Sequence, residues 1–380
     1  GLGDVYKRQD TVFAEVCVAL AHLVDLAEAD PVWEAATVLM DKLLFEIAVN
    51  AFKGVFGSSR GSTATTSLFG GYLEATSGIS KLMWGAGVFN DAIAGYVSVA
   101  CMEEYELPAM LQWIAADLPE EGLWNREHHA PGPGSSGVDL VTYKSPNGML
   151  SAAQDYRPGE PGTREHIWQA TLGPGATVFV NHPACAGLED LPGPNFWRGN
   201  AVLPRVAQWR DALIALYRLP EDDWMGMTHA YFPVHAFDAY EIRGGWAFAQ
   251  RGEGYLALTA AQGMTLVRAG QAAYRELRSV GASNVWLCQL GRAALDGDFE
   301  AFQDRILALP VVFEDLGVSW TTLRGDALAL AWEGPFTLNG AVTPLSVNRH
   351  IENPYCSVDY PATSMDIRVG EVVMRLKLAE

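Results

Sequence analysis

Apolar residues recur at intervals of three and four over the first third of the chain, which places them on one face of an α-helix. This spacing is clearest over residues 11–29 and 31–56. A loop rich in glycine, serine and threonine follows at 57–71, and helical spacing returns over 74–105 and 106–118. Helices that are apolar over much of their surface and joined as antiparallel pairs predict an all-α array or toroid.

The pattern changes near Glu120, and beyond a turn-rich segment at 128–137 it becomes that of short strands. Nine runs beyond residue 137 alternate apolar and polar positions between turn residues, which is typical of a large antiparallel sheet assembly. Two patches, 206–219 and 297–309, carry helical spacing instead. We therefore predict a multidomain α+β fold, in which a partial α/α toroid is followed by a large antiparallel β-sandwich.

These boundaries divide the chain into four segments. Residues 1–9 include DVYKRQ, which resembles the translation of a sequencing-library adaptor. We therefore set them apart from the fold and expect the native protein to continue upstream. The partial toroid is predicted over 10–122, a hinge over 123–137 and the β-sandwich over 138–380.

Composition narrows the classes of function. The 380 residues are 49% hydrophobic and carry a formal net charge of −19, which argues against nucleic-acid binding because phosphates need a basic face. No run of about 18 apolar residues is present, so we expect no membrane span. The five cysteines are scattered without CxxC spacing, which argues against a zinc ribbon or a disulfide framework and favours an intracellular protein.

Polar and aromatic residues gather in the turns between strands over residues 152–208. Within 124–210, seven Arg and Lys balance seven Asp and Glu, so the cations of an acidic chain are concentrated here. Such turns predict a groove for a polar, ring-shaped, anionic ligand. Trp197 would stack on a sugar ring, and Arg198 would bind a carboxylate in bidentate fashion. The other substrate-binding candidates in this stretch are Tyr156, Arg157, Gln169 and Asn200.

Three blocks of this half carry a resemblance to a known family: DYRPGEPGTREHIWQATLGPGATVFVNHP, NFWRGNAVLPRVAQ and THAYFP. They resemble the β domain of heparinase II/III-like polysaccharide lyases, from an incompletely characterised bacterial branch. The resemblance covers most of residues 11–380, with the N-terminal part of the toroid missing. It implies β-elimination of a uronic-acid-containing polysaccharide or oligosaccharide.

This reaction sets three chemical requirements. The uronate carboxylate must be neutralised so that the C5 proton becomes acidic, a base must take that proton, and an acid must protonate the departing glycosidic oxygen. The resemblance implies a β-domain histidine facing the toroid cleft, so we assign the base to His166 or His229. We assign the acid to Tyr231 and the neutralising group to Asn90 or Arg198.

The helical half adds two substrate-binding candidates. Asn50 would also neutralise a carboxylate, and Arg60 stands in GSSRG where the family leads us to expect a histidine. Residues 127–129, Glu-His-His, are interpreted as the rim of the groove. We expect no cofactor and no metal, since His229 and His235 are six residues apart, a spacing with no special metal geometry.

Two alternatives stay open. A glycoside hydrolase with a helical toroid would use two carboxylates. Those near the predicted groove are Asp155, Glu160, Glu165, Asp238 and Glu241. A non-catalytic carbohydrate-binding or scaffold protein of the same fold is favoured by the departure at Arg60. The sequence leaves open which polymer is bound and how many chains assemble.

Overall fold

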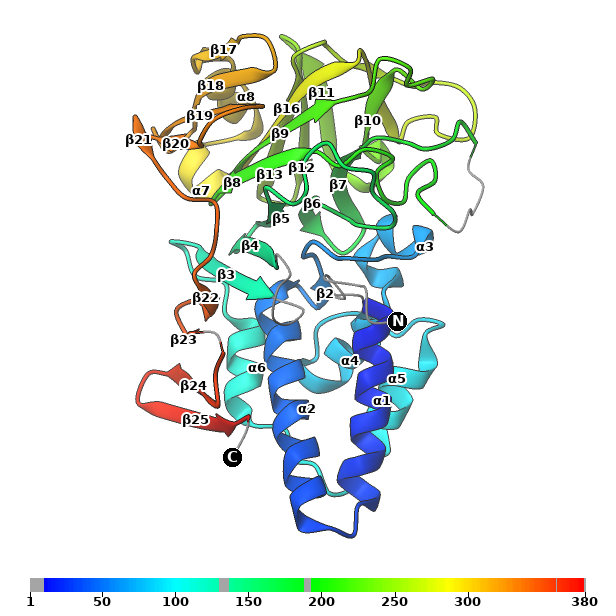
Figure 1. Ribbon diagram of the computed structural model, residues 1–380, viewed down its shortest axis with the longest axis vertical. Helices are drawn as coiled ribbons and strands as arrows, with labels where there is room; N and C mark the ends of the chain where they lie inside the picture. Colours follow the sequence, from blue (N-terminus) through cyan, green and yellow to red (C-terminus); the bar gives the residue numbers. More distant parts are fainter. Residues whose placement is uncertain (1–9, 130–136, 188–192, 360, 379–380) are drawn as a thin grey trace.

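The computed structural model describes residues 10–129, 137–187, 193–359 and 361–378. Helices gather at one end of the molecule and most strands at the other (Figure 1). The predicted adaptor segment, residues 1–9, lies outside the described residues, as does 130–136 in the second half of the predicted hinge.

Two long helices form an antiparallel hairpin at the helical end, α1 (Asp10–Leu26) and α2 (Asp30–Asn50). Pro31 lies in the first turn of α2, where a missing N–H breaks no helical hydrogen bond. Met40, Leu44 and Ile47 are completely buried in the helical core. The shorter helices are α3 (Thr65–Leu68), the 3-10 turn η1 (Gly71–Leu73), α4 (Ala75–Trp84), α5 (Ile93–Ala100) and α6 (Ala109–Ala116).

The helix predicted over 74–105 is broken between α4 and α5. Gly85 and Gly87 have φ angles of 76° and 108°, which residues with a Cβ rarely adopt. A Cβ at Gly87 would lie 2.5 Å from the carbonyl oxygen of Ser77, so the chain can turn this tightly only with glycine. One long predicted helix therefore becomes two short ones.

A ten-stranded antiparallel sheet has the order β14-β15-β10-β7-β6-β5-β4-β3-β22-β23. Its last strands adjoin the helices, so it connects the two ends of the molecule. The strands are β3 (Leu123–His129), β4 (Val138–Ser145), β5 (Gly148–Gln154), β6 (Trp168–Gly173), β7 (Ala176–Asn181), β10 (Met227–Tyr231), β14 (Thr265–Leu266), β15 (Glu276–Val280), β22 (Arg349–Glu352) and β23 (Ser357–Asp359).

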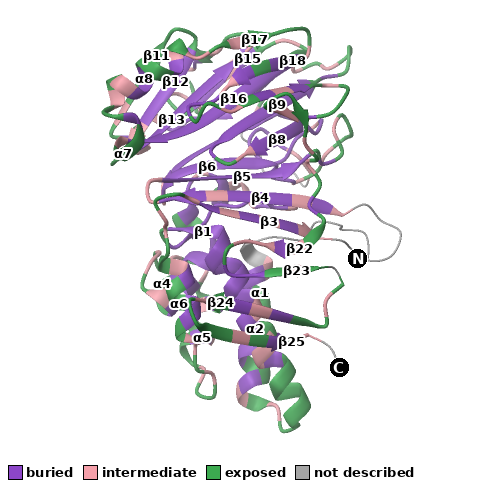
Figure 2. Cartoon of the chain, turned by 90° about the vertical axis from the view of Figure 1, so that its left-hand side faces the viewer, coloured by how far each residue is buried: buried purple, intermediate pink, exposed green. Residues whose placement is uncertain are grey.

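A six-stranded antiparallel sheet, in the order β11-β12-β13-β16-β9-β8, packs against the larger one. Residues from both sheets share one apolar core, which includes Leu150, Trp168, Val206, Leu258 and Trp286. The strands are β8 (Arg205–Trp209), β9 (Ala212–Arg218), β11 (Ala239–Arg243), β12 (Trp246–Arg251), β13 (Gly254–Ala260) and β16 (Ser283–Arg292). Figure 2 shows the strands of this region buried almost throughout.

The remaining elements cover the edges of these sheets and the helices. The helical patch predicted at 297–309 is confirmed by α8 (Phe299–Ala308). Met365, Ile367 and Leu376 of the C-terminal hairpin belong to the helical core. These elements are η2 (Val234–Ala236), α7 (Ala293–Asp296), β1 (Ala51–Phe52), β2 (Val55–Phe56), β17 (Val311–Phe313), β18 (Gly317–Thr321), β19 (Ala327–Ala331), β20 (Thr337–Leu338), β21 (Ala341–Val342), β24 (Ser364–Val369) and β25 (Val372–Lys377).

The helix predicted over 206–219 is wrong. This segment forms the β8–β9 hairpin, which turns at Arg210 with a φ of 49°. Almost every position of the hairpin is buried, whichever face it lies on. Apolar residues therefore occupy consecutive positions, and the two-residue period of a strand is hidden in the sequence.

The predicted fold class, a partial α/α toroid followed by a β-sandwich, is also wrong. Strands make up 37% of the described residues, and the protein is a β-rich α+β fold of several sheets. Of the eight α-helices in the described ranges, two exceed ten residues, and they form one hairpin rather than a ring of paired helices. No helix in these ranges is long and apolar enough to cross a membrane.

Candidate functional site

Four of the residues predicted to act on substrate converge around Phe179 of β7. Its ring centroid lies 4.9 Å from that of His166, 5.3 Å from Tyr231 and 6.3 Å from Trp197. His229 joins the group because its ring stacks on Trp197, with centroids 4.4 Å apart and planes 3° apart. We call these five side chains the aromatic cluster.

The aromatic cluster is sealed from solvent. Relative exposure is 4% for His166, 0% for His229 and 2% for Tyr231. The phenol of Tyr231 donates to the carbonyl oxygen of Phe69 at 3.3 Å, and burial raises its pKa to about 12. Burial, with the Arg60 guanidinium close by, lowers the pKa of His166 from 6.5 to about 3. Both groups are therefore held neutral in a closed core.

Arg60 joins the helical part to the sheet through a completely buried ion pair. Its Nη2 lies 2.6 Å from Oε1 of Glu74, and both side chains are inaccessible to solvent. Its backbone pairs with that of His166, while Nη2 also donates to Oε1 of Gln169 at 3.3 Å. Gln169 accepts from Nε2 of His166 at 2.9 Å. Arg60 and Gln169 therefore bind partners inside the protein. Together they hold the helical part against the sheet.

His229 is fixed at both ring nitrogens. Nδ1 lies 3.1 Å from Oε1 of Glu276, and Nε2 lies 2.8 Å from the carbonyl oxygen of Phe196. Burial raises the pKa of Glu276, but His229 and Arg278 together outweigh it, and the net pKa is lowered. Both ring nitrogens of His229 therefore lie within hydrogen-bond distance of protein oxygens, and the ring is stacked on Trp197.

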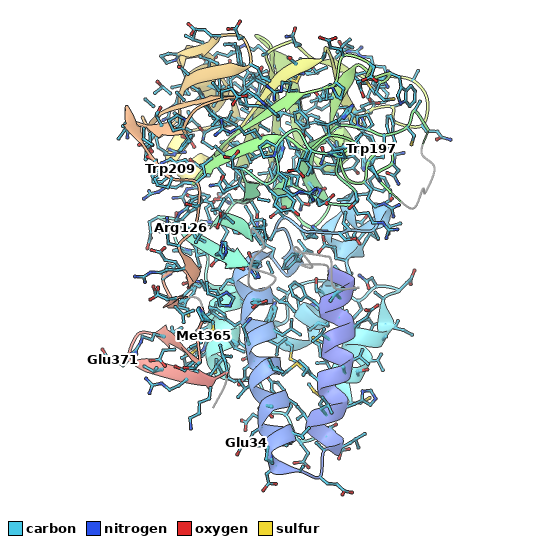
Figure 3. The ribbon with its side chains drawn as sticks, in the orientation of Figure 1. Glu34, Arg126, Trp197, Trp209, Met365 and Glu371 are labelled. Atoms are coloured by element: carbon cyan, nitrogen blue, oxygen red, sulfur yellow. The ribbon has the colours of Figure 1, made fainter. Side chains whose placement is uncertain are left out.

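The other predicted binding residues hold loops in place. Oδ1 of Asn200 accepts the backbone N–H of His182 at 2.9 Å, and the Arg198 guanidinium donates to the carbonyl oxygen of Gly193. Asn90 donates to two backbone carbonyls, those of Tyr72 and Glu74. Figure 3 shows Trp197 in the sheet region, far from the hairpin end that Glu34 marks.

Tyr156 and Arg157 lie beside each other at a turn of the sheet region. Tyr156 is 7% exposed, and burial raises the pKa of its phenol. Arg157 has a φ of 50° and forms an exposed ion pair with Glu160 at 2.6 Å. The structure therefore does not bring them into the aromatic cluster.

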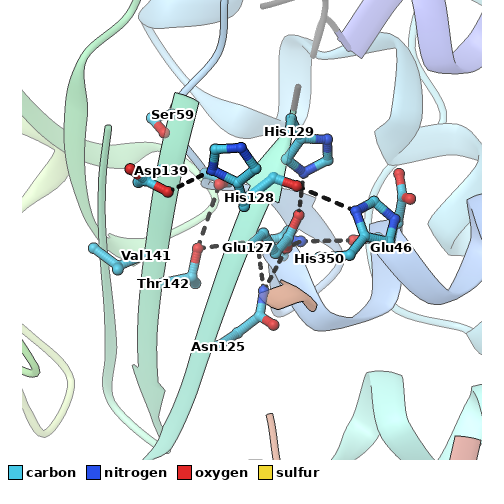
Figure 4. Close-up of polar contacts among 12 residues, drawn as sticks. Glu46, Ser59, Asn125, Glu127, His128, His129, Asp139, Val141, Thr142 and His350 are labelled. Atoms are coloured by element: carbon cyan, nitrogen blue, oxygen red, sulfur yellow. Dashed lines mark hydrogen bonds and ion pairs between the residues drawn. The ribbon is translucent and has the colours of Figure 1, made fainter. Parts of the chain in front are cut away.

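A second polar group lies where β3 meets α2, and it is partly open to solvent (Figure 4). Asn125, Glu127 and His129 alternate along β3, so their side chains share one face of the strand. Nε2 of His129 lies 2.7 Å from Oε2 of Glu127. The Glu127 carboxylate is 1% exposed, whereas His129 is 26% exposed.

Two amides fix the orientation of this carboxylate. Nδ2 of Asn50, at the end of α2, donates to Oε1 of Glu127 at 2.8 Å, and Nδ2 of Asn125 donates to the same atom at 2.5 Å. Oδ1 of Asn50 accepts from the Thr142 hydroxyl at 2.9 Å. Asn50, predicted from sequence to bind a carboxylate, thus binds the protein's own Glu127.

His350 of β22 completes the group, which we call the junction cluster: Asn50, Asn125, Glu127, His129 and His350. The His350 and His129 rings are 5.8 Å apart. Nδ1 of His350 lies 3.1 Å from the carbonyl oxygen of His128. Burial lowers the pKa of His350, and nearby Lys42 and His129 lower it further.

His128 lies on the opposite face of β3 from His129. Its Nδ1 is 2.7 Å from Oδ1 of Asp139, directly across on β4. Asp139 also borders a hollow of about 390 Å³, whose walls include Asp155, Arg205 and Phe336. This hollow lies on the opposite face of the sheet from the junction cluster and is lined by none of its residues.

The junction cluster has the components of an acid–base site. A carboxylate bonded to Nε2 of a histidine fixes the tautomer and stabilises the imidazolium, which leaves Nδ1 of His129 to exchange a proton with a ligand. No group of three or more His, Cys, Asp or Glu side chains within the described ranges could hold a metal ion. The arrangement supports proton transfer by the protein's own side chains.

Sequence reasoning noticed residues 127–129 but interpreted them as a groove rim, because the following Pro/Gly run suggested a hinge over 123–137. The structure shows that β3 occupies the first half of that segment. Alternation of apolar and polar residues does not mark this strand, because Leu123 and Trp124 are followed by five polar residues. No local signal pointed to His350, which reaches the site only through pairing of β22 with β3.

A comparison with protein families gave no match for this chain, and a comparison with curated proteins gave none either. The geometry of the two clusters therefore carries the functional argument.

Proposed function

We propose that the protein is a carbohydrate-active enzyme that cleaves a uronic-acid-containing polysaccharide or oligosaccharide by β-elimination at the junction cluster. The observation that carries the proposal is the hydrogen bond between partly exposed His129 and buried Glu127, whose carboxylate two amides hold in place. The reaction class comes from the resemblance of the sheet-region blocks. The geometry leads us to assign the base and the acid to residues of the junction cluster instead of the aromatic cluster.

In this proposal His129 is the base. Its Nδ1 takes the C5 proton, the electron pair forms the C4–C5 double bond, and the bond from C4 to the glycosidic oxygen breaks. Protonated His350, whose ring is 5.8 Å away, supplies the proton for the departing oxygen. The lowered pKa makes protonated His350 a stronger acid but also a minor species near neutral pH, so only that protonated fraction would act.

The uronate carboxylate needs a positive neighbour, and we assign this role to Lys42 of α2. Its charge acts on His350, and its ammonium group pairs with Glu46 one turn further along the helix. A substrate carboxylate would compete with Glu46 for Lys42. This competition would neutralise the substrate charge beside the base, as β-elimination requires.

A panel of uronic-acid polymers tests the proposal. The purified protein is incubated with each polymer, and the ultraviolet absorbance of the unsaturated product is followed. We expect a signal with at least one polymer, and the same signal from the control His22→Ala, whose histidine is exposed on α1. New reducing ends without absorbance would instead mean hydrolysis, which contradicts the proposal.

A second function is favoured by one specific observation. All three side chains first assigned to proton transfer, His166, His229 and Tyr231, are buried within the aromatic cluster. A non-catalytic carbohydrate-binding protein would need no open acid–base group there. Binding of a uronic-acid polymer without any chemical change, measured by calorimetry, would support this second function.

A further inference from the structure

Helix α1 carries an exposed apolar stripe beside its buried one. The inner stripe includes Cys17, Leu20 and Val24 and is buried in the helical core. The outer stripe consists of Val16, Ala19, Leu23 and Leu26, which are all exposed and are spaced by three, four and three residues. Leu26 is 71% exposed. So wide an apolar surface is typical of a helix that packs against more than one neighbour.

Helix α2 repeats this arrangement. Its inner face buries Met40 and Leu44, while Val32, Ala35 and Leu39 are exposed at spacings of three and four. The two helices pack side by side, and Figure 2 shows exposed positions covering the end of this hairpin. Exposed apolar residues are thus organised along both helices rather than scattered.

Alternating steps of three and four form the seam of a left-handed helix–helix contact. In such a contact, each apolar side chain enters a hole between four side chains of the facing helix. Because the exposed stripes of both helices have this spacing, we take the occupant to be another α-helix.

Charge identifies the chemistry of that helix. Residues 10–50, which contain the hairpin, carry eight acidic residues and one basic residue, Lys42. A second copy of the hairpin would bring the same excess of negative charge to the contact and be repelled. Lysine and arginine beside a heptad seam would instead pair with these carboxylates, as flanking charges do in coiled coils.

We propose that the α1–α2 hairpin is a docking surface for an amphipathic helix with an apolar heptad seam flanked by Lys and Arg. The docked helix buries the outer stripes of both helices. Its basic flanks lie beside acidic side chains such as Glu15, Glu28 and Glu34. This interface is independent of the junction cluster, so its test does not depend on any enzymatic activity.

Three synthetic peptides of equal length test this surface with the full chain. The first has leucine at the seam and lysine at the flanks, the second has the same seam with glutamate flanks, and the third scrambles the first so that the seam is lost. Binding is followed by calorimetry and by the fluorescence of Trp33, which is 39% exposed on α2. We expect only the first peptide to bind.

Two variants locate the contact. Leu23→Gln/Leu39→Gln should weaken binding of the first peptide by about tenfold or more, equivalent to about 1.4 kcal/mol. The control Val280→Gln changes an apolar residue that is 69% exposed, against 43% for Leu23 and 50% for Leu39, but lies on β15 of the sheet, and it should leave binding unchanged. Circular dichroism confirms that each variant keeps its fold.

Several results would overturn the proposal. If the scrambled or glutamate-flanked peptide binds as well as the first, the seam or the charge is not recognised. If no peptide binds, the surface does not dock this kind of helix. If light scattering shows a dimer that Leu23→Gln/Leu39→Gln dissociates, the occupant is a second copy.

Discussion

The same ten-stranded sheet carries two groups of histidines with opposite properties. In the aromatic cluster, beside β6 and on β10, His166 and His229 are buried, and protein atoms bind their ring nitrogens. In the junction cluster, on β3 and β22, His129 and His350 are partly exposed, and a buried carboxylate orients one of them. The difference teaches that residue type suggests acid–base chemistry, while solvent access decides where it can occur.

The largest effect is expected from Glu127→Gln in the junction cluster. The amide would place N–H groups opposite Nε2 of His129 and favour the wrong tautomer of the ring. Turnover of the uronic-acid polymer should fall by about 10²- to 10⁴-fold, while the melting temperature changes little. The matched control Asp139→Asn alters the partner of His128 on the other face of β3 and should keep normal turnover.

Arg60→Met should give the largest loss of stability in the sheet region. It leaves the Glu74 carboxylate buried without its cation, which costs about 3–5 kcal/mol. The free energy of unfolding in urea measures this cost. Adding Glu74→Leu should restore most of the loss, and a single variant as stable as the wild type would mean that the ion pair does not hold the layers together.

Acid should destabilise the aromatic cluster through His166. Its pKa is lowered on folding, so the unfolded chain binds the proton more tightly, and stability falls as the pH drops from 6.5 toward about 3. One such proton contributes a slope of about 1.4 kcal/mol per pH unit within this window. Urea unfolding between pH 6 and pH 4 should therefore show that the free energy of unfolding depends less steeply on pH in His166→Asn than in the wild type. Equal slopes in both proteins would place His166 in contact with water.

Tyr231→Phe should have the smallest effect. The hydroxyl makes one hydrogen bond, to the carbonyl oxygen of Phe69, and its loss costs about 1 kcal/mol of stability. Turnover should not change, because the phenol is sealed from substrate. A loss of stability well above about 1 kcal/mol would indicate that the carbonyl oxygen of Phe69 finds no other hydrogen-bond donor.

The sequence predicted the strands better than the helices. Alternation identified β4, β7 and β13 correctly, because each has a clear run between turn residues. It failed for the β8–β9 hairpin, where burial of both faces removes the period. It also failed to show that Gly85 and Gly87 divide a helical segment, since glycine inside an apolar run fits either a helix or a break.

The sequence also predicted the candidate site residues only in part. Sequence reasoning gathered residues that do meet, since His166, Tyr231, Trp197 and His229 form one cluster around Phe179. It could not foresee that Arg60 and Phe69 would close that cluster from the helical side. Burial depends on contacts between segments far apart in the chain, which no local pattern records.

The most direct measurement compares His129→Ala with His166→Gln on the polymer that the wild type cleaves. The initial rate of unsaturated-product formation is recorded for each, with circular dichroism to establish folding. We expect His129→Ala to lose nearly all activity and a folded His166→Gln to keep the wild-type rate. Normal activity in His129→Ala together with loss in folded His166→Gln would place the chemistry in the aromatic cluster and contradict the assignment to the junction.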